Sequence, residues 1–342
     1  MRVFIFILGF FLFCVRPVQA REQEVWGFLP SWRLTNTPSV EKVDKLFFFS
    51  IPVMGNGKLE WNSLSKRVYS KAFLDHAKKV RDKGGRVGVV FAMLKDKDLD
   101  KFLKNKDYWE TFFNEVDKLE KDIKGDLVNI DFEYQRSPTE ILSENYFEFL
   151  AKARERMSGE MSVDVYGNTI ILGSEDKLRK LFDKTDRVVF MGYDFNKRGL
   201  ATPVAPLEGM PGADLEDVFL RVNKLGLSKG KFVVALPLYG YEWRTRSTEF
   251  GATIHPSSVR ALATVGRMMD FVKNNPKAKF GYDEVTQTPW LSYVAGGKTQ
   301  QIYYENERSL KAKVDRVKKY GYTAVAWWAL GYEGKMDIDK VW

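Results

Sequence analysis

Along the chain, short apolar segments alternate with longer segments whose apolar residues recur three and four positions apart. The short segments predict eight strands, at residues 25–32, 45–53, 86–94, 127–134, 161–166, 187–195, 231–240 and 323–330. The longer segments predict helices, chiefly at residues 71–83, 108–124, 139–157, 175–182, 214–225 and 309–320. Repeated strand-then-helix units predict an α/β fold in which parallel strands close into a (β/α)8 TIM barrel.

The composition of the predicted strands favours this barrel. Residues 47–49, 87–91 and 188–190 form nearly continuous apolar runs, which are typical of strands buried on both faces. The main alternative is a doubly wound open sheet. Such a sheet usually carries a glycine-rich phosphate-binding turn after its first strand, whereas residues 28–32 read Phe-Leu-Pro-Ser-Trp.

A long insertion separates the seventh predicted strand from the last predicted helix. It covers about residues 241–301 and is too long for an ordinary loop. An apolar stripe predicts a helix over residues 257–274, and β-like segments follow at 285–293 and 301–304. We interpret it as a small α+β subdomain that forms one wall of a cleft.

The fourth predicted strand carries an unusual polar pattern. With a period of two, Asn129, Asp131 and Glu133 share one face, while the residues between them are apolar. Placing two carboxylates together on a half-buried surface costs free energy through desolvation and repulsion, so such a pair indicates a functional site. The alternative is an edge strand whose acids face water.

Polar and aromatic residues also end the other predicted strands. The sixth ends at Tyr193 and Asp194, the seventh at Tyr239, and the eighth at Trp328. In a barrel these ends meet at one mouth, which is where active sites lie. Carboxylates for chemistry and rings for stacking on sugars together predict a carbohydrate site, and aromatic residues make up 14% of the chain.

The first twenty residues predict a secretory signal peptide. Arg2 precedes an apolar run from Val3 to Val15, and small residues lead to a cleavage site after Ala20. The remaining residues 21–342 then form the barrel domain of a secreted, periplasmic or cell-wall-associated bacterial protein with no stable membrane insertion. The only cysteine, Cys14, lies in this segment, so the mature chain has neither disulfides nor thiol chemistry.

The net charge of +9 falls to +7 once Arg2 and Arg16 are removed. A basic exported protein is attracted to anionic polymers such as a cell wall. Both signs are interleaved, however, and no basic stripe of the kind that binds nucleic acid is present. We expect a monomer that binds a polysaccharide and no nucleic acid.

Four motifs resemble the family 18 glycoside hydrolases, the chitinase-like barrels. The fourth-strand signature of that family is Asp-Gly-x-Asp-x-Asp-x-Glu, and residues 126–133 read Asp-Leu-Val-Asn-Ile-Asp-Phe-Glu. The Met-x-Tyr-Asp motif is intact at residues 191–194, and residues 236–243 and Trp328 fit the last two strands. The resemblance covers essentially the whole mature chain.

The departures from the signature resemble a bacterial branch that includes spore-cortex-lytic N-acetylglucosaminidases. Leu127 replaces the glycine and Asn129 the middle acid, and residues 91–94 lack the Ser-x-Gly-Gly of true chitinases. Tyr241 stands where true chitinases often have arginine. These differences favour peptidoglycan-like glycans over chitin. An N-glycan core stays open as a third substrate, and the sequence does not distinguish internal cleavage from cleavage at a chain end.

The resemblance implies retaining hydrolysis of β-linked N-acetylglucosamine glycans, assisted by the substrate's own acetamide, with no metal or cofactor. Glu133 is implied as the proton donor, Asp131 as the acetamide-positioning acid, Tyr193 and Asp194 as supporting groups, and Trp328 as the floor. We also expect Phe28, Met191, Tyr239, Tyr241 and Trp243 to contact substrate. Because Asn129 removes the middle acid, we predict that Asp131 has no inner carboxylate with which to share a proton and stays ionised.

Two alternatives belong to other functional classes. The first is a non-catalytic, lectin-like glycan-binding protein on the same fold, although such proteins usually lack the glutamate that is present here as Glu133. The second is a metal-dependent hydrolase. The only histidines, His76 and His255, fall on a predicted helix and in the insertion, which does not favour a shared metal site.

Overall fold

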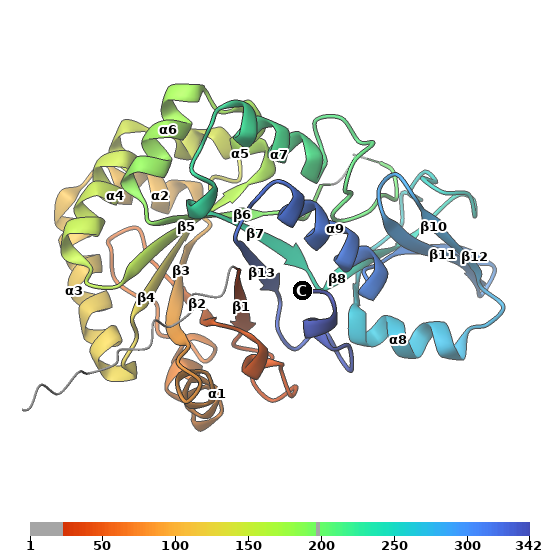
Figure 1. The fold of residues 1–342 in the computed structure, drawn as a ribbon, viewed down its shortest axis with the longest axis horizontal. Helices are drawn as coiled ribbons and strands as arrows, with labels where there is room; N and C mark the ends of the chain where they lie inside the picture. The colour runs from red at the N-terminus through yellow and green to blue at the C-terminus, as the bar shows by residue number, and fades with distance from the viewer. Residues whose placement is uncertain (1–22, 196–198) are drawn as a thin grey trace, which may run out of the picture.

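Eight parallel strands close into a barrel (Figure 1), in the order β1-β13-β7-β6-β5-β4-β3-β2. The structure is a computed structural model that describes residues 23–195 and 199–342, so the predicted signal segment lies outside the described residues. The strands are β1 Glu24–Pro30, β2 Lys45–Pro52, β3 Arg86–Met93, β4 Leu127–Phe132, β5 Glu160–Tyr166, β6 Arg187–Met191, β7 Phe232–Pro237 and β13 Ala324–Trp328. The predicted (β/α)8 fold is confirmed.

Helices cover the outside of the barrel (Figure 1). They are α1 Lys71–Arg81, α2 Asp96–Leu103, α3 Lys106–Ile123, α4 Glu144–Arg156, α5 Gly167–Leu172, α6 Glu175–Lys184, α7 Leu215–Lys224 and α9 Glu307–Lys319. The sequence did not predict α2 and α5. The predicted helix 139–157 starts later, at Glu144, because the Ser143 side chain caps it by accepting a hydrogen bond from the Tyr146 N–H.

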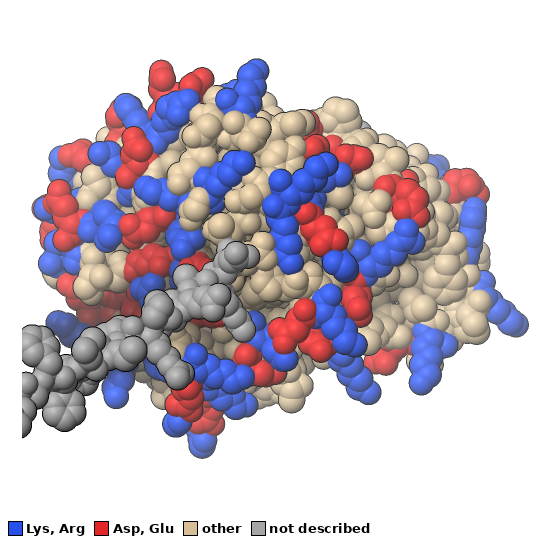
Figure 2. Space-filling model, viewed as in Figure 1, with Lys and Arg blue, Asp and Glu red and all other residues tan. Residues whose placement is uncertain are grey.

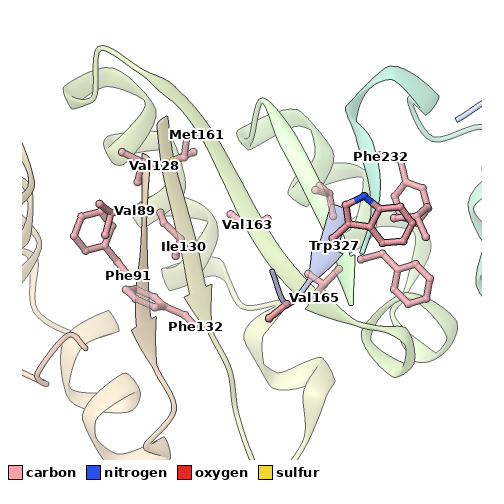
Figure 3. Packing of buried hydrophobic residues seen from close by; sticks show 14 of the residues in the cluster. Val89, Phe91, Val128, Ile130, Phe132, Met161, Val163, Val165, Phe232 and Trp327 are labelled. Carbon is pink, nitrogen blue, oxygen red and sulfur yellow. The ribbon is translucent and has the colours of Figure 1, made fainter. Parts of the chain in front are cut away.

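Each face of a barrel strand packs against a different layer. Val128, Ile130 and Phe132 of β4 point outward into the layer between strands and helices, together with Val89 and Phe91 of β3 (Figure 3). The inward-facing residues form a second buried cluster, which comprises Trp26, Phe28, Phe47, Val90, Leu127, Val189, Val233, Ala235, Ala324 and Ala326. The polar face of β4 therefore points into the barrel, as the alternation predicted.

Paired charges close the base of the barrel, at the amino ends of the strands. The buried Lys45 ammonium lies 3.0 Å from Glu24 and 2.8 Å from Glu160. Arg86 pairs with Glu160 at 2.7 Å, and Arg187 pairs with Glu24 at 3.0 Å. Each acid therefore meets two or more cations at this end of the barrel.

A five-stranded sheet in the order β10-β11-β12-β8-β9 lies beside the barrel, with α8 Val265–Asn274 at its edge (Figure 1). Its strands are β8 Tyr239–Arg244, β9 Ala261–Thr264, β10 Lys279–Asp283, β11 Thr288–Ala295 and β12 Lys298–Tyr303. The predicted seventh strand, 231–240, is therefore wrong at its end: it divides at Leu238, whose N–H donates to the Trp328 carbonyl at 2.7 Å.

The predicted insertion helix 257–274 is also too long. Residues 261–264 pair with β8 as strand β9, and Thr264 then caps α8. Val259, counted in the apolar stripe, is 86% exposed.

Lys and Arg are interleaved with Asp and Glu over the face drawn in Figure 2. Among the residues that the structure describes, no helix combines the length and the apolar character that crossing a membrane requires.

Candidate active site

The acidic stretch at the end of β4 opens into a cavity at the carboxyl ends of the strands. Its volume is about 190 Å3. It is lined by Phe28, Phe49, Leu94, Asp131, Glu133, Asp164, Tyr166, Val189, Met191, Tyr193, Asp194 and Trp328. Seven of the residues predicted for the site thus lie around one space, although they come from four different strands and the segments that follow them.

Aromatic rings form one side of this cavity. The Trp328 ring lies 4.5 Å from Phe49 and 6.4 Å from both Phe28 and Tyr193, measured between ring centroids. The Tyr193 ring is nearly parallel to that of Trp328, with 17° between their planes. Such a wall offers the flat apolar surface on which a sugar ring stacks.

Glu133 is positioned by side chains from both sides. Its backbone N–H donates to the Met93 carbonyl of β3 at 3.1 Å, which fixes the chain just beyond β4. The Tyr166 hydroxyl, at the end of β5, donates to Glu133 Oε2, and Gln135 Nε2 donates to the same oxygen at 3.3 Å. Burial and the Glu133 charge raise the pKa of Tyr166, so this tyrosine remains a donor.

Asp194 is held by two tyrosines of the insertion sheet. The Tyr239 and Tyr241 hydroxyls donate to Asp194 Oδ1 at 3.1 and 2.7 Å. Asp194 has a φ of 61°, a left-handed conformation that is uncommon outside glycine and often occurs at functional sites. Tyr239 and Tyr241 therefore act on the cavity through Asp194 and do not line it.

Trp243 lies one step further along β8, outside the cavity lining. Its ring centroid is 5.8 Å from that of Tyr241. The exposed Arg260 covers both rings, with its guanidinium carbon 4.2 Å from the Tyr241 centroid and 5.9 Å from that of Trp243. Among the described residues, Arg260 forms no ion pair, so its charge is available to a ligand.

Asn129 lies below the cavity and is fully buried. Its Nδ2 donates to Ser162 Oγ at 3.0 Å and to Asp164 Oδ1 at 2.7 Å, both on β5. Burial, Glu133 and Asp164 raise the pKa of Asp131 well above its usual range. Burial and Glu133 raise the pKa of Asp164 to about 8, although hydrogen bonding to Asn129 opposes the rise.

The prediction that Asp131 has no carboxylate with which to share a proton is therefore wrong. The middle acid is absent from β4, but Asp164 of β5 supplies a carboxylate to the same cavity. Two buried neighbouring acids without a cation between them are not both ionised at neutral pH, because each charge destabilises the other. The prediction that Asp131 stays ionised throughout is contradicted by its own pKa, which burial, Glu133 and Asp164 raise.

The sequence contained a signal for the two residues that were missed. Ser162, Asp164 and Tyr166 alternate with Val163 and Val165, which is the same polar-inward pattern that singled out β4. The pattern assigns the face of β5 but not the distance from Glu133. That distance depends on the register between β4 and β5, in which Asn129 pairs with Ser162.

The arrangement combines a carboxyl group held at the end of β4, a second acid behind it and an aromatic wall. This is suited to protonating a glycosidic oxygen while a neighbouring carboxylate orients the sugar. His76 and His255 lie apart from it: His76 Nε2 contacts the Leu34 carbonyl at 2.8 Å, and His255 contacts Ser257.

Comparison with known proteins gives a consistent result. Residues 24–333 match the family model of the glycosyl hydrolases family 18. The chain is 25% identical to the cortical fragment-lytic enzyme of Bacillus subtilis over 217 residues, 60% of this chain and 46% of that one. It is 24% identical to the probable di-N-acetylchitobiase 1 of Dictyostelium discoideum over 268 residues, 70% of this chain and 69% of that one. The chain thus spans about half the length of the Bacillus relative.

Solved structures share the fold. The spore cortex-lytic enzyme SleL of Bacillus megaterium aligns with a TM-score of 0.74 at 21% identity, over 94% of this chain and 74% of that one. A chitinase from Cycas revoluta, solved with (GlcNAc)3, aligns with a TM-score of 0.74 at 16% identity, over 93% of this chain and 97% of that one.

Proposed function

The chain belongs to family 18 of the glycosyl hydrolases and is a glycosidase, and from that premise we propose that it cleaves β-linked N-acetylglucosamine glycans by substrate-assisted, retaining hydrolysis. The observation that carries the proposal is the position of Glu133, at the end of β4 with Asp131 behind it and the aromatic wall opposite. No separate nucleophile is needed, because the acetamide of the substrate takes that role.

In the proposed reaction, Glu133 gives its proton to the glycosidic oxygen as the bond from that oxygen to the anomeric carbon breaks. The acetamide carbonyl oxygen bonds to the same carbon and forms an oxazolinium ion. Asp131 accepts a hydrogen bond from the acetamide N–H and offsets the positive charge that develops there. Water then attacks the anomeric carbon as the bond from that carbon to the acetamide oxygen breaks, and it gives a proton to Glu133. This restores the acid, the free acetamide and the original anomeric configuration.

The other cavity residues have supporting roles in this proposal. Tyr193 donates to the acetamide oxygen, and Asp194, fixed by its tyrosines, favours a distorted sugar ring. Trp328, with Phe28 and Met191 beside it, forms the floor under the reacting sugar.

We favour peptidoglycan over chitin as the substrate. Peptidoglycan carries carboxylates on its muramic acid residues and peptides, whereas chitin is uncharged. Arg260 presents a guanidinium beside Tyr241, on the insertion sheet next to the cavity, and arginine suits the recognition of carboxylates. The names of the similar proteins include a cortical fragment-lytic enzyme and a spore cortex-lytic enzyme, which agrees with this preference.

The test is to incubate the wild type and Glu133→Gln with purified peptidoglycan, chitin oligomers and a high-mannose glycoprotein, and to identify the products by mass. We expect disaccharide-repeat fragments of peptidoglycan, and a loss of about 10²- to 10⁴-fold in kcat for Glu133→Gln. Tight binding without turnover by the wild type would instead indicate the lectin-like alternative.

Partly deacetylated chitin tests the mechanism separately. If the acetamide is the nucleophile, every new reducing end carries an N-acetyl group. Products that end in free glucosamine would rule out substrate assistance.

We also propose that the protein acts outside the cytoplasm as a monomer. The support is the pattern of residues 1–20 and the net positive charge, which suits an anionic wall. Sequencing the amino terminus of exported protein should give Arg21, and light scattering should give the mass of one chain.

A further inference from the structure

Asp164 lies level with Asp131 on the neighbouring strand. The register of β4 and β5 pairs Asn129 with Ser162 and Ile130 with Val163. The next residues on the two strands are Asp131 and Asp164, and their side chains point to the same inner face. Asp131 is 4% exposed and Asp164 is 7% exposed.

Asn129 connects the two strands beneath these acids. Both of its observed hydrogen bonds are donated by Nδ2 toward β5, one to Ser162 and one to Asp164. Among the described residues, no donor reaches Asn129 Oδ1 or Asp131 Oδ1, although both atoms are buried. Buried acceptors of this kind are usually satisfied, and the proton of a carboxylic acid is a donor that this site can supply.

The surroundings of Asp164 contain acids and phenols. Asp131 faces it from β4, Glu133 from the residue after β4, Tyr146 from α4, and Tyr193 from the segment after β6. A side-chain hydrogen bond to Glu133 also contributes to the raised pKa of Asp131. Tyr166 lies two residues along β5. No lysine, arginine or histidine is among the described residues that line the cavity. Burial of two carboxyl groups without a cation favours one shared proton.

We propose that Asp164 is a positioning carboxylate that holds the proton that Asp131 must release when the substrate acetamide binds. Asp131 and Asp164 together carry one proton, both without substrate and with substrate bound. Without substrate, the proton is shared between the two acids. When the acetamide N–H donates to Asp131, the proton is bound by Asp164, so the pair keeps a charge of −1. The transfer of the proton on substrate binding rests on the proposed function, whereas the shared proton in the free protein does not.

The first test compares pH profiles of kcat/KM for Asp164→Asn and for the exchanged pair Asn129→Asp/Asp164→Asn. Asp164→Asn removes the shared proton that stabilises the single negative charge of the active pair, so the acid limb should move by about one pH unit or more to higher pH. The exchanged pair restores an acid next to Asp131, from β4, and should return the limb toward the wild-type position.

Ser162→Ala is the matched control for these variants. It removes the second hydrogen bond of Asn129 without changing any charge, so its acid limb should stay at the wild-type pH. A decrease by the same factor at every pH from 4 to 8 in Asp164→Asn would overturn the proposal and leave Asp164 a structural role. An exchanged pair that folds but keeps the displaced limb would also overturn it.

The second test needs no substrate. Burial and Glu133 raise the pKa of Asp164 to about 8 in the folded chain, whereas the unfolded chain releases this proton near the ordinary value of 3.8. The wild type should therefore lose stability as the pH rises between these values, and Asp164→Asn, in which only Asp131 keeps a raised pKa, should lose less. The Tm of the variant minus that of the wild type should rise across this window.

Parallel Tm curves would contradict the shared proton whatever the enzyme hydrolyses. Failure to cleave any of the three glycans, with Tm curves that diverge as expected, would overturn only the proposed function. If Asp164→Asn does not fold, the exchanged pair provides the same two measurements.

Discussion

Glu133 receives two hydrogen bonds at one carboxylate oxygen, from Tyr166 and Gln135. Tyr166 ends β5, a rigid strand, whereas Gln135 lies in the loop beyond β4 and is exposed. The tyrosine is therefore the better anchor, since a donor on a strand holds its partner more precisely than one on a loop. Tyr166 fixes the oxygen that faces β5 and thereby orients the carboxyl group for the glycosidic oxygen.

This gives a prediction for Tyr166→Phe. Removing the hydroxyl removes a hydrogen bond to an ionisable group, which contributes about 1.5–3 kcal/mol. We expect kcat/KM on the cleaved glycan to fall roughly 10- to 100-fold. Initial rates over a range of substrate concentrations provide the measurement.

Tyr322→Phe is the control for this prediction. The Tyr322 hydroxyl is buried on the outer side of the barrel and donates to the Phe219 carbonyl, so its loss should affect stability and leave kcat/KM near the wild-type value. A Tyr166→Phe enzyme within twofold of the wild type would show that Gln135 alone orients Glu133.

At the residue scale, the sequence identified the acids of β4 but not their partners on β5. Motifs specify residues that are close along the chain, and Asp131 and Glu133 are two positions apart. Asp164 is 33 positions from Asp131, and only the pairing of β4 with β5 brings them level. From the sequence, Asn129 therefore indicated that Asp131 has no neighbouring acid, whereas Asp164 of the next strand lines the same cavity.

The insertion sheet is the element that builds one side of the site. Its strand β8 begins two residues after β7 ends, and carries Tyr239, Tyr241 and Trp243 from Asp194 toward the surface. The sequence predicted one strand through Gly240 because apolar and aromatic residues continue across the turn at Leu238. Hydrophobicity shows that a residue is buried but not to which of two adjoining sheets it belongs.

Arg260 gives this element a testable effect on substrate choice. In Arg260→Gln the guanidinium over Tyr241 is lost, and an exposed charge pair contributes about 0.2–1 kcal/mol. We expect the ratio of kcat/KM for peptidoglycan to that for chitin oligomers to fall roughly 2- to 5-fold. The wild-type ratio should also decrease at high salt, because exposed charges are screened.

Arg308→Gln is a matched control, since Arg308 also covers a tyrosine ring, Tyr282, but is paired with Glu284 outside the cavity. Its ratio should equal that of the wild type. If Arg260→Gln reduces both activities equally, Arg260 supports the packing of Tyr241 and does not select the substrate.

Charge is distributed unequally between the two ends of the whole molecule. At the base, Lys45, Arg86 and Arg187 neutralise Glu24 and Glu160, whereas the described residues that line the cavity at the mouth include four acids and no cation. The sequence could not show this, because Glu24 and Arg187 meet only when the barrel closes. The ion pairs at the base should therefore stabilise the fold less as the pH falls. The acids at the mouth should stabilise it less as the pH rises.

The base supplies the last prediction, for Lys45→Met. Lys45 is buried and its acids are partly exposed, so the loss should be about 2–3 kcal/mol of unfolding free energy at pH 7, below the 3–5 kcal/mol of a fully buried pair. Burial opposes the shift, but Lys45, Trp26 and Arg187 together lower the pKa of Glu24. Its stabilisation is thus complete above the unfolded value of 4.5 and is lost as the pH falls through the folded pKa.

The difference in unfolding free energy between the wild type and Lys45→Met should consequently be constant from pH 5 to 7 and shrink below about pH 4.5. Urea denaturation at each pH measures it, with Lys71→Met as the control, since the exposed Lys71 pair with Asp75 should change stability by less than about 0.5 kcal/mol. A difference that persists unchanged to pH 3 would mean that Lys45 stabilises the base by packing over the Trp26 ring, 4.6 Å away. In that case the loss of stability at low pH would not come from the ion pairs at the base. Only the loss of stability near neutral pH, at the mouth, would then be electrostatic.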